Sequence, residues 1–135
     1  MVLRSTGVLV AGLLGVALVT LAGADGVPPP LKSNTVSGIG VVLTAPNGMT
    51  LYVYLNDREP GKSVCTGACE ANWPPFRPAV DAPPTPPDPL AVITRLDKSK
   101  QYAYKGKPLY YCKTDRKPGD ITGHKFRDFW LAAQP

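Results

Sequence analysis

The stretch Leu-Tyr-Val-Tyr-Leu-Asn-Asp-Arg-Glu-Pro-Gly, residues 51–61, recurs as Leu-Tyr-Tyr-Cys-Lys-Thr-Asp-Arg-Lys-Pro-Gly, residues 109–119. The Leu-Tyr, Asp-Arg and Pro-Gly pairs fall in register in both copies. Trp73 and Trp130 then follow at nearly the same distance from each copy. This many matched positions are not expected by chance, so the chain contains an internal repeat.

Each copy predicts a strand followed by a polar loop. Residues two apart in a strand share a face, so Tyr52 and Tyr54 are expected to lie together. Asp57 and Asp115 end the two strands, where their carboxylates can accept hydrogen bonds from backbone N–H groups of the following turn. Besides Tyr52 and Asp57, the repeated motif thus contains the pair Tyr110 and Asp115. Trp73 and Trp130 are expected to cover the core of each half.

Composition supports a β protein of one domain. The 135 residues include 16 prolines and 13 glycines, which are too many for a helix bundle, because both residues interrupt helices. Six tyrosines and two tryptophans favour strands. The net charge of +5 is modest and acidic residues are interleaved, so no nucleic-acid partner is expected.

The N-terminus reads as a signal peptide spanning residues 1–24. Arg4 precedes an apolar run at 7–21, and Ala22-Gly23-Ala24 fits the small-x-small cleavage pattern. Cleavage after Ala24 predicts a periplasmic or secreted product with no stable membrane anchor. Retention of the segment as an uncleaved anchor is the alternative. Residues 25–34 include three consecutive prolines and are expected to form a flexible leader.

The remaining chain is expected to form a mostly β, small single domain of two pseudo-symmetric strand–turn repeats. It covers 35–135, with repeat 1 at about 41–76, a proline-rich connection at 78–89 and repeat 2 at about 91–132. Strands are predicted at 35–43, 50–55, 91–95, 101–104 and 109–113, with a short strand or turn at 126–131. Turns are predicted at 46–48 and 105–107, a loop at 115–123, and one or two helical turns at Cys65 to Asn72.

Together these features resemble a bacterial lipoprotein family known as the secreted repeat of unknown function. The resemblance rests on the two Tyr-x4-Asp motifs, Cys65-Thr-Gly-Ala-Cys69, Trp73-Pro-Pro and the run Tyr-Lys-Gly-Lys-Pro-Leu-Tyr at 104–110. It spans about residues 41–132 and implies an exported protein with no assigned activity. Two positions depart from the family: Ala24 replaces the lipid-accepting cysteine, and Cys112 stands where an aromatic residue is commoner.

Three cysteines are left in the exported part of the chain. A disulfide between Cys65 and Cys69 is the favoured interpretation, because disulfides persist outside the cytoplasm. A redox-active pair is the alternative. Covalent haem attachment is disfavoured, because no histidine follows Cys69. The odd count leaves Cys112 free, paired between molecules or chemically active.

Cys112 and His124 are the weak candidates for metal binding. A thiolate and an imidazole would suit copper or zinc, but two ligands are too few for a closed tetrahedral site. The alternative is a buried thiol and a solvated histidine. Nucleophilic catalysis by Cys112 would need His124 as base and Asp120 or Asp128 to orient it.

The sequence therefore favours an exported, non-enzymatic binding or interaction module with no cofactor. Its partner would be an envelope protein or a small ligand. The alternative is a periplasmic redox or metal-handling accessory that uses Cys112, His124 and the Cys65–Cys69 pair.

Overall fold

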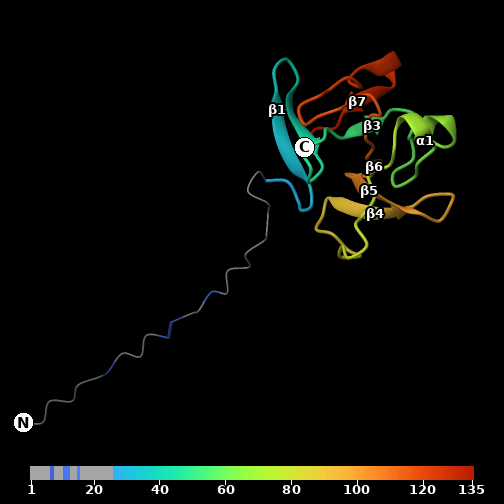
Figure 1. Ribbon diagram of the computed structural model, residues 1–135. Coiled ribbons are helices and arrows are strands. Elements are labelled where there is room, and N and C mark those ends of the chain that lie inside the picture. The colour runs from blue at the N-terminus through green and yellow to red at the C-terminus, as the bar shows by residue number, and fades with distance from the viewer. Residues whose placement is uncertain (1–6, 8–10, 13–14, 16–25) are drawn as a thin grey trace, which may run out of the picture.

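The computed structural model describes residues 7, 11–12, 15 and 26–135. The predicted signal peptide therefore lies almost wholly outside the described residues. The described chain is a mostly β domain with one short α-helix (Figure 1). In this view β3 and β7 lie between the hairpin that contains β1 and the helix α1.

The first hairpin consists of β1 (Lys32–Val36) and β2 (Gly40–Thr44), which pair antiparallel. The single strand predicted at 35–43 is therefore wrong. Gly38 and Gly40 have positive φ values of 79° and 100°, a conformation that glycine adopts without steric cost. These two glycines let the chain reverse within what reads as one continuous β-type run. The reversal predicted around Asn47 and Gly48 does occur, after β2.

The second hairpin belongs to a three-stranded sheet of β4 (Leu90–Thr94), β5 (Lys100–Tyr104) and β6 (Lys107–Pro108). The strands predicted at 91–95 and 101–104 are thus present. Lys105 and Gly106 connect β5 to β6, and both have positive φ. A two-residue loop of this kind matches the right-handed twist of its flanking strands, so the predicted turn at 105–107 is also present.

The two halves meet along a central ladder. There β3 (Tyr52–Tyr54) pairs antiparallel with β7 (Trp130–Ala132), so a strand of repeat 1 is completed by a strand of repeat 2. The strand predicted at 109–113 does not form. Within that segment Tyr110 makes only isolated bridges, to Tyr52 and to Pro75. Pairing stops on one side of Pro75 because Pro74 has no N–H to donate. It stops on the other side because the N–H of Leu109 donates to Tyr102.

The C-terminal segment of each half also inserts into the other half. The N–H of Ala133 donates to the carbonyl of Leu51 at 2.8 Å, and the N–H of Leu43 donates to the carbonyl of Ala133 at 2.7 Å. Phe76 occupies the equivalent position in the other half, where its backbone bonds to Tyr102 and Leu109. Each repeat therefore supplies backbone partners to its counterpart, and the two form one intertwined domain.

Each half of the domain contains one short helical segment. The helix α1 (Ala68–Asn72) lies within the helical turns predicted at Cys65 to Asn72. In repeat 2 a 3₁₀ helix, η1 (Phe126–Asp128), precedes β7, so the segment predicted at 126–131 contains both a turn and a strand.

The flexible leader predicted at 25–34 is wrong for its described part. Val27 and Leu31 are buried in the core, and the chain joins β1 at Lys32. The N–H of Leu31 bonds to the carbonyl of Pro28 at 3.0 Å, which closes a turn across the prolines. Burial of these two apolar side chains fixes a segment whose proline content alone suggested mobility. The proline-rich connection at 78–89 contains no strand and is largely exposed.

The buried side chains form two clusters. One lies between the hairpins and contains Leu43, Leu51, Leu90, Tyr102 and Leu109 among its fully buried members. The other lies at the junction of the repeats and contains Val42, Tyr52, Cys65, Trp73, Tyr110, Cys112, Trp130 and Ala132. The second cluster thus contains the tyrosines and tryptophans of the repeat motif and two of the three cysteines.

Candidate functional site

The two Tyr-x4-Asp motifs are joined crosswise at the junction of the repeats. The phenol of Tyr52 donates to Asp115 Oδ2 at 2.7 Å, and the phenol of Tyr110 donates to Asp57 Oδ2 at 2.6 Å. Each tyrosine therefore bonds to the aspartate of the other repeat rather than to its own. The sequence reveals the spacing within each motif, but it contains no signal for this exchange.

The second carboxylate oxygen of each aspartate holds a loop. Asp57 Oδ1 accepts the N–H of Val64 at 2.7 Å, and Asp115 Oδ1 accepts the N–H of Thr122 at 2.9 Å. The aspartates do therefore accept backbone N–H groups, as expected at a strand end. The donors lie seven residues further along the chain, so each carboxylate closes a whole loop rather than the adjacent turn.

Both tyrosines remain protonated because of where they lie. Burial, together with the hydrogen bond to a carboxylate, raises the pKa of Tyr52 and of Tyr110 far above the usual value for tyrosine. Burial also raises the pKa of Asp57, against the opposing effects of the bonds from Tyr110 and Val64. Neither pair provides a nucleophile or an accessible base. We conclude that the Tyr–Asp pairs hold the two repeats together.

Stacked aromatic rings fill the space between the two pairs. Trp73 and Trp130 stack with centroids 3.8 Å apart and planes only 4° from parallel. Tyr54 stacks on Trp130 at 4.3 Å. Tyr52 meets Trp73 edge to face at 5.5 Å, and Tyr110 meets Trp130 in the same way at 5.2 Å. The tryptophans are 5% and 4% exposed, so they do close the core, but as one shared stack.

A groove of about 560 Å³ opens along the edge of this stack. It combines aromatic side chains with small polar and basic ones. Its lining consists of Tyr54, Ala68, Cys69, Asn72, Trp73, Cys112, Lys113, Thr114, Phe126, Arg127, Phe129 and Trp130. A concave site with an apolar wall and a few polar groups is the usual form of a small-ligand site.

The rim of the groove is an unusual loop. Phe126 and Phe129 are 45% and 46% exposed, although both are large apolar side chains. The residues between and before them, Lys125, Arg127 and Asp128, all have φ between 50° and 60°. This left-handed conformation is uncommon for non-glycine residues, and three of them within four positions store backbone strain of a kind that clusters at functional sites.

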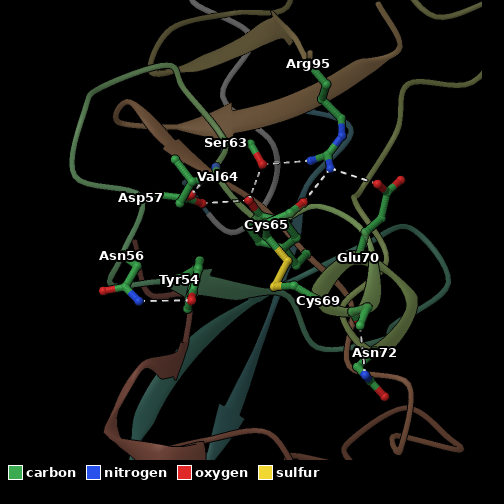
Figure 2. The surroundings of a disulfide bond; sticks show 12 residues. Tyr54, Asn56, Asp57, Ser63, Val64, Cys65, Cys69, Glu70, Asn72 and Arg95 are labelled. Carbon is green, nitrogen blue, oxygen red and sulfur yellow. Dashed lines mark hydrogen bonds and ion pairs between the residues drawn. A yellow bond between two sulfur atoms is a disulfide. The ribbon is translucent and has the colours of Figure 1, made fainter. Parts of the chain in front are cut away.

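The predicted cysteine pair lies beside the groove. Cys65 and Cys69 form a disulfide, with Cα atoms 5.2 Å apart, and Cys69 lines the groove. Figure 2 shows Arg95 reaching from β4's end towards this loop. The Arg95 guanidinium donates to the Cys65 carbonyl at 2.6 Å and to Glu70 at 3.1 Å. The burial of Arg95 was not predicted from the sequence, because a charged residue at the end of a predicted strand is ordinarily exposed.

Arg95 also connects the disulfide loop to the Tyr–Asp pairs. Its Nη1 donates to Ser63 Oγ at 2.8 Å and to Gln101 Oε1 at 2.7 Å. Ser63 Oγ lies 2.7 Å from the phenol oxygen of Tyr110. Because the Tyr110 proton goes to Asp57, the Ser63 hydroxyl must donate to Tyr110. The hydrogen bonds thus run in one direction from Arg95 through Ser63 to Asp57.

Cys112 is the free cysteine of the described chain, and it is buried in the floor of the groove. Its Sγ lies 3.2 Å from Thr114 Oγ1 and 3.8 Å from Thr122 Oγ1. Cys112 occupies the repeat position of Tyr54. The smaller side chain leaves room where the other half has a stacked ring.

His124 has a structural partner rather than a catalytic one. Its Nδ1 accepts the N–H of Ala132 at 3.0 Å, and burial, with the nearby Lys125 charge, lowers the pKa of the imidazole. A base needs a free ring nitrogen, yet Nδ1 is occupied, and in the neutral ring Nε2 then carries the proton. Asp120, the first orienting candidate, instead accepts two backbone N–H groups of its own loop. The triad with Cys112 is not assembled, and Asp128 bonds through its backbone to Lys125.

Metal ligands are not gathered at one place either. Within residues 26–135, no group of three or more His, Cys, Asp or Glu side chains could hold a metal ion. Cys112 contacts threonines, and His124 bonds to the backbone of β7. These surroundings offer no third ligand for copper or zinc.

The fold and its junction define a class: a small β domain made of two intertwined copies of one strand–turn unit, locked by exchanged Tyr–Asp pairs. A family model described as "secreted repeat of unknown function" matches residues 35–77 and 91–134, and the chain belongs to this family. The two matched segments correspond to the two halves of the fold. No curated protein and no solved structure matches the chain. The family is described as secreted, and none of the described residues forms a helix able to cross a membrane.

Proposed function

We propose that the protein is an exported, non-enzymatic binding module whose ligand site is the aromatic groove at the junction of the repeats. The observation that carries this proposal is the exposed pair Phe126 and Phe129. A strained loop holds these side chains at the rim of a cavity of ligand size. Apolar side chains held in water beside a cavity are typical of a recognition surface.

The difference between the repeats supports the same site. The Tyr–Asp pairs are present twice and serve the scaffold. The groove is lined by unlike parts of the two repeats: Cys69 of the repeat 1 disulfide on one side, and Cys112 with the η1 loop of repeat 2 on the other. The duplication of the fold explains the features that both repeats share. It does not explain a groove whose two sides are built from different residues.

Export is supported by the family description and by the N-terminal sequence. Cleavage after Ala24 would release a periplasmic or secreted protein without a lipid anchor. Its first residue would be Asp25, a position that intact mass spectrometry of the exported protein checks directly. A mass that retains residues 1–24 would contradict cleavage.

Tryptophan fluorescence provides the test of binding, because both tryptophans lie against the groove. The exported protein would be titrated with members of a small-molecule library, and hits would be repeated on Phe126→Ala and Phe129→Ala. Leu96→Ala is the matched control, because Leu96 is 76% exposed and lies outside the groove. Hits lost in the phenylalanine variants but retained in the control support the proposal. Hits that none of the variants affects would refute this site.

A redox role is the second candidate, because Cys69 of the disulfide and the thiol Cys112 line the same groove. In that case Cys112 would exchange with the disulfide on exposure to a thiol reductant, and the pairing found by peptide mapping would change. A pairing that stays at Cys65–Cys69 throughout would exclude this role.

A further inference from the structure

From the lining of the groove we infer the class of its ligand: a flat aromatic molecule that carries a negative charge. This inference rests on the proposed function and deepens it. It follows from three properties of the groove: its aromatic walls, the sign of its charges and its size.

The walls of the groove are suited to a planar ring. Five of its twelve lining residues are aromatic: Tyr54, Trp73, Phe126, Phe129 and Trp130. The stack of Trp73 on Trp130 is already fixed in the core. Phe126 contacts Trp73 and Phe129 contacts Tyr54, but both side chains stay about half exposed and offer the remaining ring surface. Stacking a planar ligand there removes apolar surface from water and adds a favourable ring–ring contact.

The charges of the groove have one sign. Lys113 and Arg127 are the charged residues of the lining, and no carboxylate is among the twelve. Two nearby acidic groups are engaged elsewhere: Glu70 pairs with Arg77 and Arg95, and Asp115 bonds to Tyr52. Asp128 stands on the exposed rim loop next to Arg127 but is not part of the lining. A cationic ligand would meet like charge in this site, whereas an anion would meet two basic side chains.

Arg127 already shows the geometry that such a ligand would use. Its guanidinium lies 5.4 Å from the centre of the Phe126 ring, within the range of a cation–π contact. The backbone of Arg127 is left-handed, with φ of 50°, and in this conformation the guanidinium lies beside the Phe126 ring. A ligand whose anionic group meets Arg127 would therefore place its ring over Phe126 or Phe129.

The volume of the groove limits the size of the ligand. Its volume of about 560 Å³ is within the usual range for one small organic ligand. A naphthalene-sized ring system with one acidic substituent is small enough to fit within this volume. A folded protein domain or a long chain would have to bind outside it.

A charge series on one ring tests the inference. The probes are naphthalene-2-sulfonate, 2-naphthalenemethanol and 2-naphthylmethylammonium, which share a ring and differ in charge. Binding to the exported protein would be followed by isothermal titration calorimetry and by tryptophan fluorescence. We expect the sulfonate to bind about tenfold or more tightly than the alcohol, and the ammonium probe to bind most weakly.

Charge reversal assigns the effect to the groove. In Lys113→Glu and Arg127→Glu the sulfonate should lose about tenfold in affinity, and the ammonium probe should gain. Lys107→Glu is the matched control: Lys107 is exposed, lies outside the groove and has no side-chain partner among the described residues. Circular dichroism melting shows that each variant is folded. Raised salt should weaken the sulfonate and leave the alcohol unchanged.

Two contrary results separate the two proposals. Equal binding of the three probes, abolished by Phe126→Ala, overturns the anionic class while the binding groove stands. Failure of every probe to bind, or binding that Phe126→Ala and Phe129→Ala leave unchanged, overturns the ligand class and the groove together.

Discussion

Tyr52 and Tyr110 occupy the same position of the two repeats and bond directly to each other through their backbones. The N–H of Tyr52 donates to the carbonyl of Tyr110 at 2.8 Å, and the N–H of Tyr110 donates to the carbonyl of Tyr52 at 3.0 Å. Their phenols then cross to Asp115 and Asp57 of the opposite repeats. The local two-fold symmetry of the domain therefore centres on Tyr52 and Tyr110. The Tyr-x4-Asp motif that the repeats share is what joins the two repeats.

Removing one phenol should destabilise the domain markedly. Tyr52→Phe leaves the ring in place but deprives Asp115 Oδ2 of its buried donor, and Tyr110→Phe does the same to Asp57. A hydrogen bond to a charged group contributes about 1.5–3 kcal/mol, so each variant should lose that much free energy of unfolding in urea. Tyr54→Phe is the control, because its partly exposed phenol meets only Asn56, and it should lose less than about 1 kcal/mol. Equal losses in all three variants would contradict the locking role.

The exchange of segments predicts that the halves stay together when the chain is cut. A specific protease site placed at Val80, which is fully exposed in the connection, would be cleaved in the folded protein. No disulfide crosses this cut, because the Cys65–Cys69 bridge closes within repeat 1. The cut divides residues 25–135 into fragments of nearly equal length. The nicked protein should elute at the size of the intact domain in native size-exclusion chromatography, and as separate fragments of half that length in denaturant. Elution at the size of the separate fragments under native conditions would show that each repeat is an independent fold.

How much of this architecture the sequence predicts depends on the range of each interaction. Local signals succeeded: β4, β5, the Lys105-Gly106 turn and the helical turn after Cys65 follow from residues next to one another. The repeat itself predicted two equivalent halves. Pairing across 63 and 53 residues was not predictable, because no local pattern states that Tyr52 bonds to Asp115 rather than to its own Asp57.

The errors have physical causes as well. The break between β1 and β2 depends on positive φ at Gly38 and Gly40, within a run whose composition favours one strand. Val27 and Leu31 were assigned to a leader on the proline content around them, whereas the core buries them. The groove was missed because Phe126, Arg127 and Phe129 look like core packing until their exposure is known.

Arg95 should be far more important for stability than its neighbour Arg77, although both bond to Glu70. The side chain of Arg95 is 3% exposed and that of Arg77 is 40% exposed. Arg95→Met removes four hydrogen bonds and leaves Gln101 and Ser63 without a buried donor, so it should cost about 3 kcal/mol or more. Arg77→Met should cost less than about 1 kcal/mol, because exposed ion pairs contribute little. Urea unfolding of both variants decides the matter, and similar losses would refute the structural role of Arg95.

Alkaline pH should unfold the protein through the same tyrosines. The pKa values of Tyr52 and Tyr110 are raised in the folded state above the ordinary value of 10.0 that applies to the unfolded chain. The folded state therefore keeps these protons longer. Their contribution is fully present below about pH 10 and is lost as the pH rises further, because the unfolded chain can release the protons and the folded chain cannot. The free energy of unfolding in urea should accordingly fall steeply above about pH 10.

In the double variant Tyr52→Phe, Tyr110→Phe this fall in unfolding free energy should be shallower. Part of the fall should remain, because burial also raises the pKa values of Tyr102 and Tyr111. Ultraviolet absorbance should show the phenolates of these buried tyrosines appearing only together with loss of the near-ultraviolet circular dichroism of the tryptophan stack. A phenolate signal from all six tyrosines near pH 10, with the circular dichroism intact, would mean that the junction of the repeats is open to water.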